Sequence, residues 1–338
     1  MATVINPSAG PIFIDATTTQ SVLPYTSLIN HLQTSIPTTT SVIQSPIRHS
    51  HQTSSSSSSN ITNNLLLMPA WSESPTTFPY IGVKLVTVHP DNSALNLPGV
   101  HASYLIFNSV TGQPLASMDG TELTVRRTAC VSALASHYLS NVHSKVLLMV
   151  GAGSMAPHLI KAHLTIRPEI NYVMIWNRNV GRCDNLVENF GKESGMDGVR
   201  FEVCQDLESG VRIADIVSCA TNSETPLVMG EWLKAGAHLD LVGSYKPSMR
   251  ECDDEAMTRG RVFVDNEHAM VEAGELVGAF ERGVMKTDEI EGDLVELTKG
   301  EKIGRRDDKE ITLFVSVGSA VVDLLSAQLA YETVAGKP

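Results

Sequence analysis

A short apolar run that leads directly into a glycine turn constrains this chain more than any other feature. Residues 145–156 read Lys-Val-Leu-Leu-Met-Val-Gly-Ala-Gly-Ser-Met-Ala, a buried-strand pattern followed by Gly-x-Gly-x-x-Ala. Gly151 permits a tight turn, Gly153 lets a pyrophosphate approach the backbone, and Ala156 lets the following helix pack on the strand. The partial positive charge of that helix N-terminus favours an anion. The pattern predicts a site for a nicotinamide dinucleotide, and the alternative is an ordinary strand-to-helix turn.

The end of the next predicted strand indicates which form of the cofactor binds. Enzymes that use NAD usually carry an acid there, which binds the ribose 2′-hydroxyl and repels a 2′-phosphate. In this chain the strand Tyr172–Trp176 runs into Asn177-Arg178. A charge-assisted hydrogen bond from arginine is worth about 1.5–3 kcal/mol, on the order of a 10- to 100-fold preference. We therefore expect NADPH, with NADH as a weaker cofactor; the alternative is an arginine that lies at a strand end by chance.

The pattern of predicted elements changes at the start of the glycine motif. Upstream of it, alternating apolar segments predict an antiparallel sheet, and 121–139 is predicted as a long helix that joins two domains. From Lys145 onward, short apolar runs alternate with helices, which is typical of a doubly wound parallel sheet. The expected strands are 65–68, 80–88, 102–107, 146–150, 172–176, 201–203, 213–219, 239–242, 262–264 and 312–317. A last helix, to about Tyr331, is expected to return to the first domain.

Length and charge set the class of protein. With 338 residues, of which 42% are hydrophobic, the chain is long enough for about two domains. A formal net charge of −12 argues against a nucleic-acid partner. The tight basic cluster formed by Lys302, Arg305 and Arg306 lies beside Asp307-Asp308 and is interpreted as a solvated loop. No apolar run approaches the roughly 20 residues that span a bilayer, so we expect no membrane partner.

The cysteines and the N-terminal composition bear on the compartment. The five cysteines form no Cys-x-x-Cys pair and are odd in number, which is typical of free thiols in a reducing compartment. Residues 53–60 are almost entirely serine and predict a mobile surface loop. Because the first 60 residues are rich in Ser and Thr and poor in acids, the composition also matches a plastid transit peptide. We expect a cytoplasmic or plastid protein.

Nine collinear segments resemble the ornithine cyclodeaminase and mu-crystallin family, and within it plant reductases of dehydropipecolate-type cyclic imines. The resemblance extends from Ile12 to Tyr331. It implies an α/β fold in which a Rossmann NADP-binding domain, 126–319, follows a smaller α+β domain for substrate binding and dimerisation, 1–125 with 320–338. The segments are 45–48, 83–86, 118–120, 127–133, 150–153, 175–178, 219–221, 242–243 and 316–319.

The family resemblance also implies the site residues. Arg48, Lys84 and Arg127 are expected to bind the carboxylate of the substrate, which compensates the cost of burying an anion beside the nicotinamide. Lys84 lies in the apolar run 81–86 and is interpreted as an internal charge rather than an edge residue. No metal is expected. The expected cofactor-binding residues are Gly151, Ala152, Gly153, Ser154, Met155, Asn177, Arg178, Asn179, Cys219, Ala220, Thr221, Val242, Gly243 and Ser319. His101 is a weaker candidate, either a proton relay or a packed histidine.

One departure from the family pattern bears on the reaction. Cyclodeaminases carry an aspartate shortly after the glycine of the 242–243 segment, and here the matching position is Tyr245. A phenol titrates near pH ~10 and is a poor general base at neutral pH. Tyr245 therefore argues against ornithine deamination and against an alanine-dehydrogenase-like reaction, which stay as alternatives to the reaction expected below.

The resulting expectation is an NADPH-dependent imine oxidoreductase that acts on CH–NH bonds. Its substrate would be a small cyclic ketimine carboxylate: 1-piperideine-2-carboxylate, reduced to pipecolate in lysine catabolism, or the smaller 1-pyrroline-2-carboxylate, reduced to proline. The resemblance implies a homodimer built through the N-terminal sheet. The alternative from another class is a non-catalytic binding protein of the mu-crystallin type that retains NADPH and a small ligand.

Overall fold

The computed structural model describes residues 10–55, 62–95 and 97–336, which form two compact units. Unit 1 consists of 1–127 together with 319–338, and unit 2 consists of 128–318. The chain thus leaves unit 1, completes unit 2 and returns to unit 1 with its last helix. The long helix α3 (Gly120–Leu139) contains the crossing point, between Arg127 and Thr128.

Unit 1 is built on a seven-stranded sheet whose order is β1-β7-β6-β5-β4-β2, with β3 also paired to β4. Only β1 runs parallel to its neighbour, and the other pairs are antiparallel. The strands are β1 (Ile12–Ile14), β2 (Ile43–Gln44), β3 (His49–Ser55), β4 (Thr62–Ser72), β5 (Tyr80–Val88), β6 (Val100–Asn108) and β7 (Pro114–Asp119). The antiparallel sheet predicted before the glycine motif is therefore present and larger than expected.

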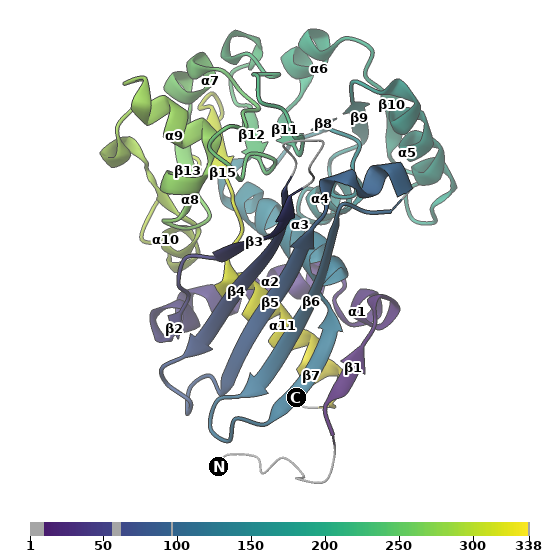
Figure 1. Ribbon diagram of the computed structural model, residues 1–338. Coiled ribbons are helices and arrows are strands. Elements are labelled where there is room, and N and C mark those ends of the chain that lie inside the picture. The colour runs from purple at the N-terminus through teal and green to yellow at the C-terminus, as the bar shows by residue number, and fades with distance from the viewer. Residues whose placement is uncertain (1–9, 56–61, 96, 337–338) are drawn as a thin grey trace. The chain divides into compact units, whose positions relative to one another are not determined.

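One face of this sheet is covered by helices. The C-terminal helix α11 (Ala320–Val334) contacts β4, β5, β6 and α2 (Tyr25–Thr39), and it crosses behind the strands in Figure 1. The short helix α1 (Ala16–Val22) contacts α11 and β7. Most residues of α11 are buried, as expected for a helix that is apolar on nearly all sides. The predicted return of the last helix to the first unit is confirmed.

Unit 2 is a doubly wound sheet of eight parallel strands, which confirms the predicted fold class. The strand order is β10-β9-β8-β11-β12-β15-β13-β14, so the winding reverses between β8 and β11. Ligands of such sheets bind at the carboxyl ends of the strands at this reversal. The strands are β8 (Val146–Val150), β9 (Tyr172–Trp176), β10 (Arg200–Val203), β11 (Ile216–Cys219), β12 (His238–Leu241), β13 (Arg261–Val264), β14 (Gly292–Asp293) and β15 (Thr312–Val315).

Helices connect these parallel strands. The longer ones are α4 (Ala156–Ile166), α5 (Val180–Lys192) and α9 (Gly274–Glu281), and the shorter ones are α6 (Leu207–Ile213), α7 (Asp254–Arg259), α8 (Ala269–Glu272) and α10 (Leu294–Lys299). Asp253 caps α7 by accepting a hydrogen bond from the Ala256 N–H, as its position before the helix predicts. The strand predicted from residue 213 begins instead at Ile216, because Ile213 still ends α6.

The loop predicted for 53–60 is wrong at its beginning. Residues 53–55 belong to β3, whose polar sequence forms a strand because it pairs with β4 from His49↔Leu67 to Ser55↔Thr62. Residues 56–60 lie outside the described part of the chain. A polar strand of this kind carries no hydrophobic alternation, so the sequence pattern does not reveal it.

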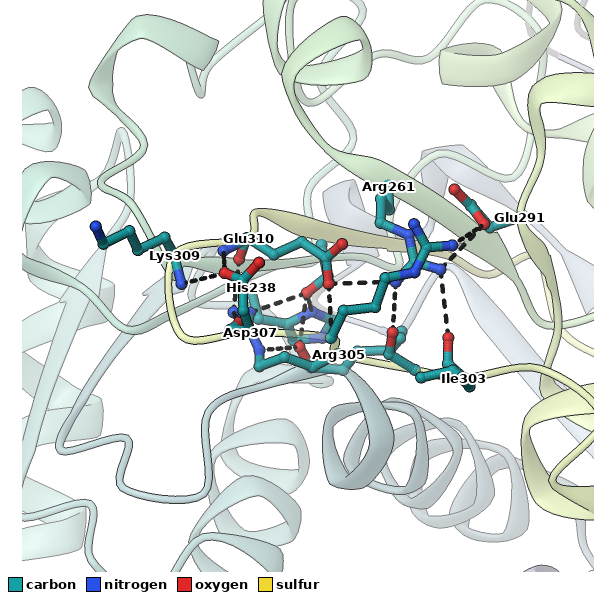
Figure 2. A network of polar contacts seen from close by, with 12 residues as sticks. His238, Arg261, Glu291, Ile303, Arg305, Asp307, Lys309 and Glu310 are labelled. Carbon is teal, nitrogen blue, oxygen red and sulfur yellow. Dashed lines mark hydrogen bonds and ion pairs between the residues drawn. The ribbon is translucent and has the colours of Figure 1, made fainter.

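The basic cluster near residue 305 is only partly solvated, contrary to expectation. The Arg305 guanidinium is half-buried and donates hydrogen bonds to the carbonyls of Leu139 (2.8 Å) and Glu310 (2.6 Å). Figure 2 shows this arginine beside Arg261, which binds Glu291 at 3.0 Å. Both arginines donate hydrogen bonds to backbone carbonyl groups of loops around β12, β13 and β15, so their role in unit 2 is structural. Among the residues placed by the structure, no helix is long and apolar enough to cross a membrane.

Candidate active site

The glycine turn lies at the reversal of the sheet in unit 2. Gly151 has a φ of +112°, and a Cβ at this position would lie 2.5 Å from the Ala220 carbonyl oxygen, so only glycine fits between β8 and the loop after β11. Gly153 is exposed, and a Cβ there would meet no atom within 4 Å. The backbone at Gly153 is therefore open to a ligand. The predicted residues Ala152, Ser154 and Met155 complete the turn into α4.

The loops after β11 and β12 adjoin this turn. The Ala220 N–H donates to the Val150 carbonyl, and the Val242 N–H donates to the Cys219 carbonyl, both at 2.9 Å. Thr221 and Gly243 follow on these two loops. The side chain of Cys219 is completely buried, so its thiol is not available to a ligand and only its backbone is near the turn.

The end of β9 carries no acid. Asn177, Arg178 and Asn179 follow the strand, and the side chain of Arg178 is exposed. Asn179 is the N-cap of α5, and the Asn177 amide donates to the Asn179 carbonyl at 3.1 Å. A cation and two amides, in the absence of a carboxylate at this strand end, match the requirements of a phosphorylated ribose. The residues of unit 2 thus fit a dinucleotide cofactor.

In unit 1, two of the three predicted cations meet on one buried carboxylate. The Lys84 Nζ lies 2.7 Å from the Asp323 Oδ2, and the Arg127 Nε lies 2.8 Å from the Asp323 Oδ1. Lys84 is 2% and Arg127 5% exposed, while Asp323 is fully buried. Lys84 lies on β5, Arg127 on α3 and Asp323 on α11. The cluster therefore connects one strand of the sheet to two helices.

The alternation of β5 explains why Lys84 points inward. Tyr80, Gly82, Lys84 and Val86 are buried in sequence, and the residues between them are half-buried. Successive side chains of a strand point to opposite faces, so Lys84 shares the face that α11 covers. The interpretation of Lys84 as an internal charge therefore agrees with its position.

Burial and neighbouring charges set the ionisation of this cluster. Desolvation, with smaller contributions from the charges of Arg127 and Arg48, lowers the pKa of Lys84 to about 8, although the nearby Asp323 carboxylate opposes the shift. For Asp323, burial raises the pKa, but the charges of Arg127 and Lys84 outweigh burial, so the net pKa lies below its usual value. Asp323 is thus an ionised carboxylate, and Lys84 is an ammonium group that can release its proton close to neutral pH.

Arg48 is half-buried in the segment between β2 and β3, close enough for its charge to act on Lys84. His101 does not join this cluster. It is exposed on β6, where it pairs with Thr87, and both residues point to the sheet face opposite Lys84. Within one chain, His101 is therefore not placed to relay a proton to Lys84.

Tyr104 lies directly across the sheet from Lys84, and sequence reasoning missed it. Its side chain is fully buried, and burial together with the Asp323 charge raises the pKa of its hydroxyl. A Cβ on Gly82 would overlap the Tyr104 hydroxyl, so glycine leaves room for the phenol over β5. Tyr104 is a neutral group beside the charged cluster.

Two other predicted positions have local roles. Ser319 is the N-cap of α11, and its hydroxyl accepts a hydrogen bond from the Val321 N–H at 3.2 Å. Tyr245 is 38% exposed on the loop after β12 and contacts the Lys246 ammonium through its ring. Tyr245 therefore offers no carboxylate where the cyclodeaminase pattern requires one.

Three buried acids are functional candidates that sequence reasoning did not identify: Asp323, Glu251 and Glu275. Asp323 could have been found, because it is the one charged residue in the apolar run Ala320–Ala327. Glu251 and Glu275 lie beneath the loops after β11 and β12. In the regions that the structure describes, no group of His, Cys, Asp and Glu side chains is arranged to hold a metal ion.

A parallel doubly wound unit with an open glycine turn, next in sequence to a unit that contains a buried cation cluster, defines a nicotinamide-dependent oxidoreductase. Residues 19–338 match the model of the ornithine cyclodeaminase/mu-crystallin family, and the chain belongs to that family. It is an imine oxidoreductase that acts on CH–NH bonds with a nicotinamide cofactor.

Three comparisons place the chain within the family. It is 53% identical over 326 residues to Protein SAR DEFICIENT 4 of Arabidopsis thaliana, covering 96% of this chain and 98% of the relative. It is 40% identical over 271 residues to a Delta(1)-pyrroline-2-carboxylate reductase of Colwellia psychrerythraea, covering 80% and 83%. The structure of the Thermococcus litoralis Delta(1)-pyrroline-2-carboxylate reductase with NADH and L-proline superposes with a TM-score of 0.87, at 28% identity over 96% of this chain and 98% of that one.

Proposed function

We propose that this enzyme uses NADPH to reduce cyclic ketimine carboxylates, converting 1-piperideine-2-carboxylate to pipecolate and 1-pyrroline-2-carboxylate to proline. The observation that carries the proposal is the cluster of Lys84 and Arg127 around Asp323, with Arg48 nearby. The names of the relatives support the five-membered substrate. The six-membered substrate rests on the sequence resemblance.

Charge balance in unit 1 favours a substrate that carries a carboxylate. Lys84 and Arg127 bring two positive charges to the single buried acid Asp323, so the cluster retains excess positive charge. An anionic substrate group compensates that excess and gains charge-assisted hydrogen bonds from the two guanidinium groups. In this proposal Arg48 and Arg127 hold the carboxylate and fix the orientation of the ring. Substrates without the carboxylate should fail.

Lys84 supplies the proton of the reaction. Reduction of a C=N bond adds a hydride to carbon and a proton to nitrogen, and the bound nicotinamide supplies the hydride. An ammonium group with a pKa of about 8 can give its proton to the ring nitrogen at neutral pH, and Asp323 keeps it oriented. Asp323 also offsets the repulsion that the cations exert on a protonated imine.

The preference for NADPH follows from the end of β9. Arg178 is exposed beside two amides and no acid, so it is available to pair with a 2′-phosphate. Thr221, Val242, Gly243 and the turn at 151–155 bind the rest of the dinucleotide in this proposal. Unit 1 then acts as the substrate domain and unit 2 as the cofactor domain.

The half-buried face of the unit 1 sheet supports a homodimer. On β5, Ile81, Val83 and Leu85 alternate with the buried residues and point away from α11, and Leu105 and Phe107 of β6 extend the same face. A contiguous apolar face of this kind typically marks a protein interface. We propose that a second copy of the chain covers it.

The decisive experiment follows oxidation of NADPH and of NADH with separate substrates: the six-membered imine, the five-membered imine, pyruvate with ammonia, and ornithine. We expect turnover with the two imines only, and a higher kcat/KM with NADPH. Substrate preference for pyruvate with ammonia, or for ornithine, contradicts the proposed reaction. An NADH preference contradicts only the role of Arg178.

A further inference from the structure

One buried carboxylate joins the two loops that follow β11 and β12. The Oε1 of Glu251 accepts hydrogen bonds from the Thr221 N–H at 2.6 Å and from the Thr221 hydroxyl at 2.7 Å. Its Oε2 accepts a hydrogen bond from the Gly243 N–H at 2.8 Å. A single side chain thus fixes the backbone just beyond the carboxyl ends of two adjacent strands.

The surroundings are shaped around this contact. A Cβ on Gly243 would lie 2.5 Å from the Glu251 Oε1 and 2.3 Å from the Thr221 carbonyl oxygen. The backbone of Gly243 has an ordinary φ, so close packing and not backbone conformation requires glycine there. The backbone N–H of Glu251 donates a hydrogen bond to the carboxyl group of Glu275 on α9. This bond fixes the backbone position of Glu251.

Burying two carboxyl groups side by side costs folding free energy, which points to a function of Glu251 that offsets this cost. Glu251 is fully buried, and burial together with the neighbouring Glu275 carboxyl raises its pKa to about 8. The other titratable groups that face it are the buried thiols Cys219 and Cys252. Two buried acids close together destabilise the fold unless hydrogen bonds compensate for their desolvation and mutual repulsion.

The chemistry of the contact explains why glutamine cannot replace Glu251. Both oxygens of Glu251 face a backbone N–H group, one from Thr221 and one from Gly243. A glutamine amide carries one oxygen and one NH₂ group, so either orientation sets a donor against a donor. Only a carboxyl group can accept from both loops, whether it is ionised or neutral.

The two loops belong to the half of the sheet that lies beyond the reversal. The first half of the sheet consists of β8, β9 and β10. The glycine turn follows β8, and Arg178 follows β9. The second half begins with β11 and β12. In doubly wound dinucleotide-binding sheets the two halves bind the two mononucleotide ends of the cofactor. Loops 220–223 and 242–245 therefore face the nicotinamide end.

We propose that Glu251 is a positioning residue for the nicotinamide half of the cofactor, holding the Thr221 and Gly243 loops at the spacing that this half requires. The proposal depends on the nicotinamide cofactor and is independent of which imine is the substrate. Glu251 does not touch the reacting atoms. Its effect is on the fit of one end of the dinucleotide.

The test compares Glu251→Gln with the wild type in two binding measurements. The first is the Kd of the dinucleotide that the wild type prefers, from titration of its fluorescence. The second is the Kd of the matching adenosine fragment, 2′,5′-ADP for NADPH or 5′-AMP for NADH, measured by calorimetry. We expect the dinucleotide Kd to rise about 10-fold or more, since a buried N–H loses its acceptor, and the fragment Kd to change by less than about twofold.

Two further variants make the result decisive. Thr221→Val removes one of the three donors at constant volume, and we expect a smaller rise in dinucleotide Kd with the fragment Kd unchanged. Asp215→Asn is the control for the loss of a carboxylate far from the cofactor. The Asp215 Oδ2 accepts from the N–H groups of Lys145 and Val146, its Oδ1 pairs with Lys234 at 2.6 Å, and the residue lies at the amino end of the sheet, so we expect both Kd values to stay near the wild type. Thermal unfolding checks that each variant folds.

Either of two outcomes overturns the proposal. In the first, Glu251→Gln and Thr221→Val leave the dinucleotide Kd at the wild-type value. In the second, the dinucleotide and the fragment weaken equally, which indicates a general loss of the unit 2 fold. If the glutamine variant does not fold, the Thr221→Val result alone decides by the same criteria.

Discussion

Asp323 is the buried acid that neutralises charge inside unit 1. Two cations share this one carboxylate, and all three side chains are buried. Removing one partner of a buried ion pair leaves an uncompensated charge and typically costs about 3–5 kcal/mol. The acid is therefore needed for the stability of the fold as well as for the orientation of Lys84.

Asp323→Asn should destabilise the protein by about 3–5 kcal/mol in urea unfolding, because Lys84 and Arg127 lose their counter-ion. Glu332→Gln is the matched control. Glu332 also lies on α11, but it accepts a hydrogen bond from the Tyr80 hydroxyl and lies outside the cation cluster. A loss no larger in Asp323→Asn than in Glu332→Gln would contradict the importance of the cluster.

Lys84 makes activity depend on pH in a defined direction. Its pKa is lowered to about 8 in the free enzyme, and its acidic form is the one that donates the proton, so kcat/KM should be highest below pH 8 and should fall as the pH rises through that value. Lys84→Arg keeps the charge but does not release a proton in this range. A profile of kcat/KM from pH 6 to 10 should show, for this variant, a low value without the decline near pH ~8. A wild-type profile that stays flat through this region argues against proton transfer from Lys84.

The sequence drew attention to the buried lysine of unit 1 but not to the buried acids Asp323 and Glu251. Lys84 is conspicuous because a charge interrupts the apolar run 81–86. Its partner Asp323 is far away in sequence, and only the return of α11 to the sheet brings the two together. Glu251 gives no signal, since it lies in a loop rich in polar residues and acts through hydrogen bonds to backbone groups.

Among the elements, the turn between β8 and α4 separates two kinds of glycine. Gly151 is required by backbone conformation and by contact with Ala220, whereas Gly153 is surrounded by open space. The fold requires the first glycine, whereas the second leaves its backbone open, as the proposed cofactor site needs. The motif alone does not distinguish them, and the structure does.

Gly151→Ala should lower the midpoint of thermal unfolding even without cofactor, because its Cβ meets the Ala220 carbonyl at 2.5 Å. Gly153→Ala should leave that midpoint within about 2 °C, an effect below roughly 0.5 kcal/mol. Its effect should appear instead as a cofactor Kd raised about 10-fold or more, since the methyl group occupies the approach of the pyrophosphate. Equal midpoints for both variants would show that the contact at Ala220 relaxes without cost.

Periodicity located several strands that bury an apolar face, but it missed the strand β3 and the helix α2. The strands β5, β6, β8 and β9 alternate or form apolar runs, and the sequence located them closely. In contrast, β3 is polar and exists through its partner β4. Helix α2 is rich in Thr and Ser and contains Pro37, so its sequence resembles a loop even though four of its residues are buried.

For the whole molecule, length predicted two units and the return of the last helix predicted that one of them is discontinuous. A homodimer built through the N-terminal sheet was expected from the family resemblance alone. The alternation of Ile81, Val83 and Leu85 now gives that proposal a surface. The sequence does not predict which face of the sheet α11 covers, because both faces of β5 are apolar.

Leu85→Asp should convert the homodimer to a monomer, because a charge at the centre of an apolar interface must be desolvated without a partner. Analytical ultracentrifugation at micromolar concentration measures this change. Ser21→Asp, an exposed position on α1, is the control and should remain dimeric. A wild-type protein that sediments as a monomer refutes the proposed dimer directly.

The discontinuity of unit 1 has a consequence for how the protein is made. During translation the segment that forms the antiparallel sheet emerges first, and the helix that supplies Asp323 emerges last. Residues 128–318 are contiguous and can reach their native topology on the ribosome, whereas Lys84 and Arg127 stay without a counter-ion until the chain is released. A stop codon between positions 319 and 323 would therefore leave residues 128–318 whole and remove the acid that pairs with Lys84 and Arg127.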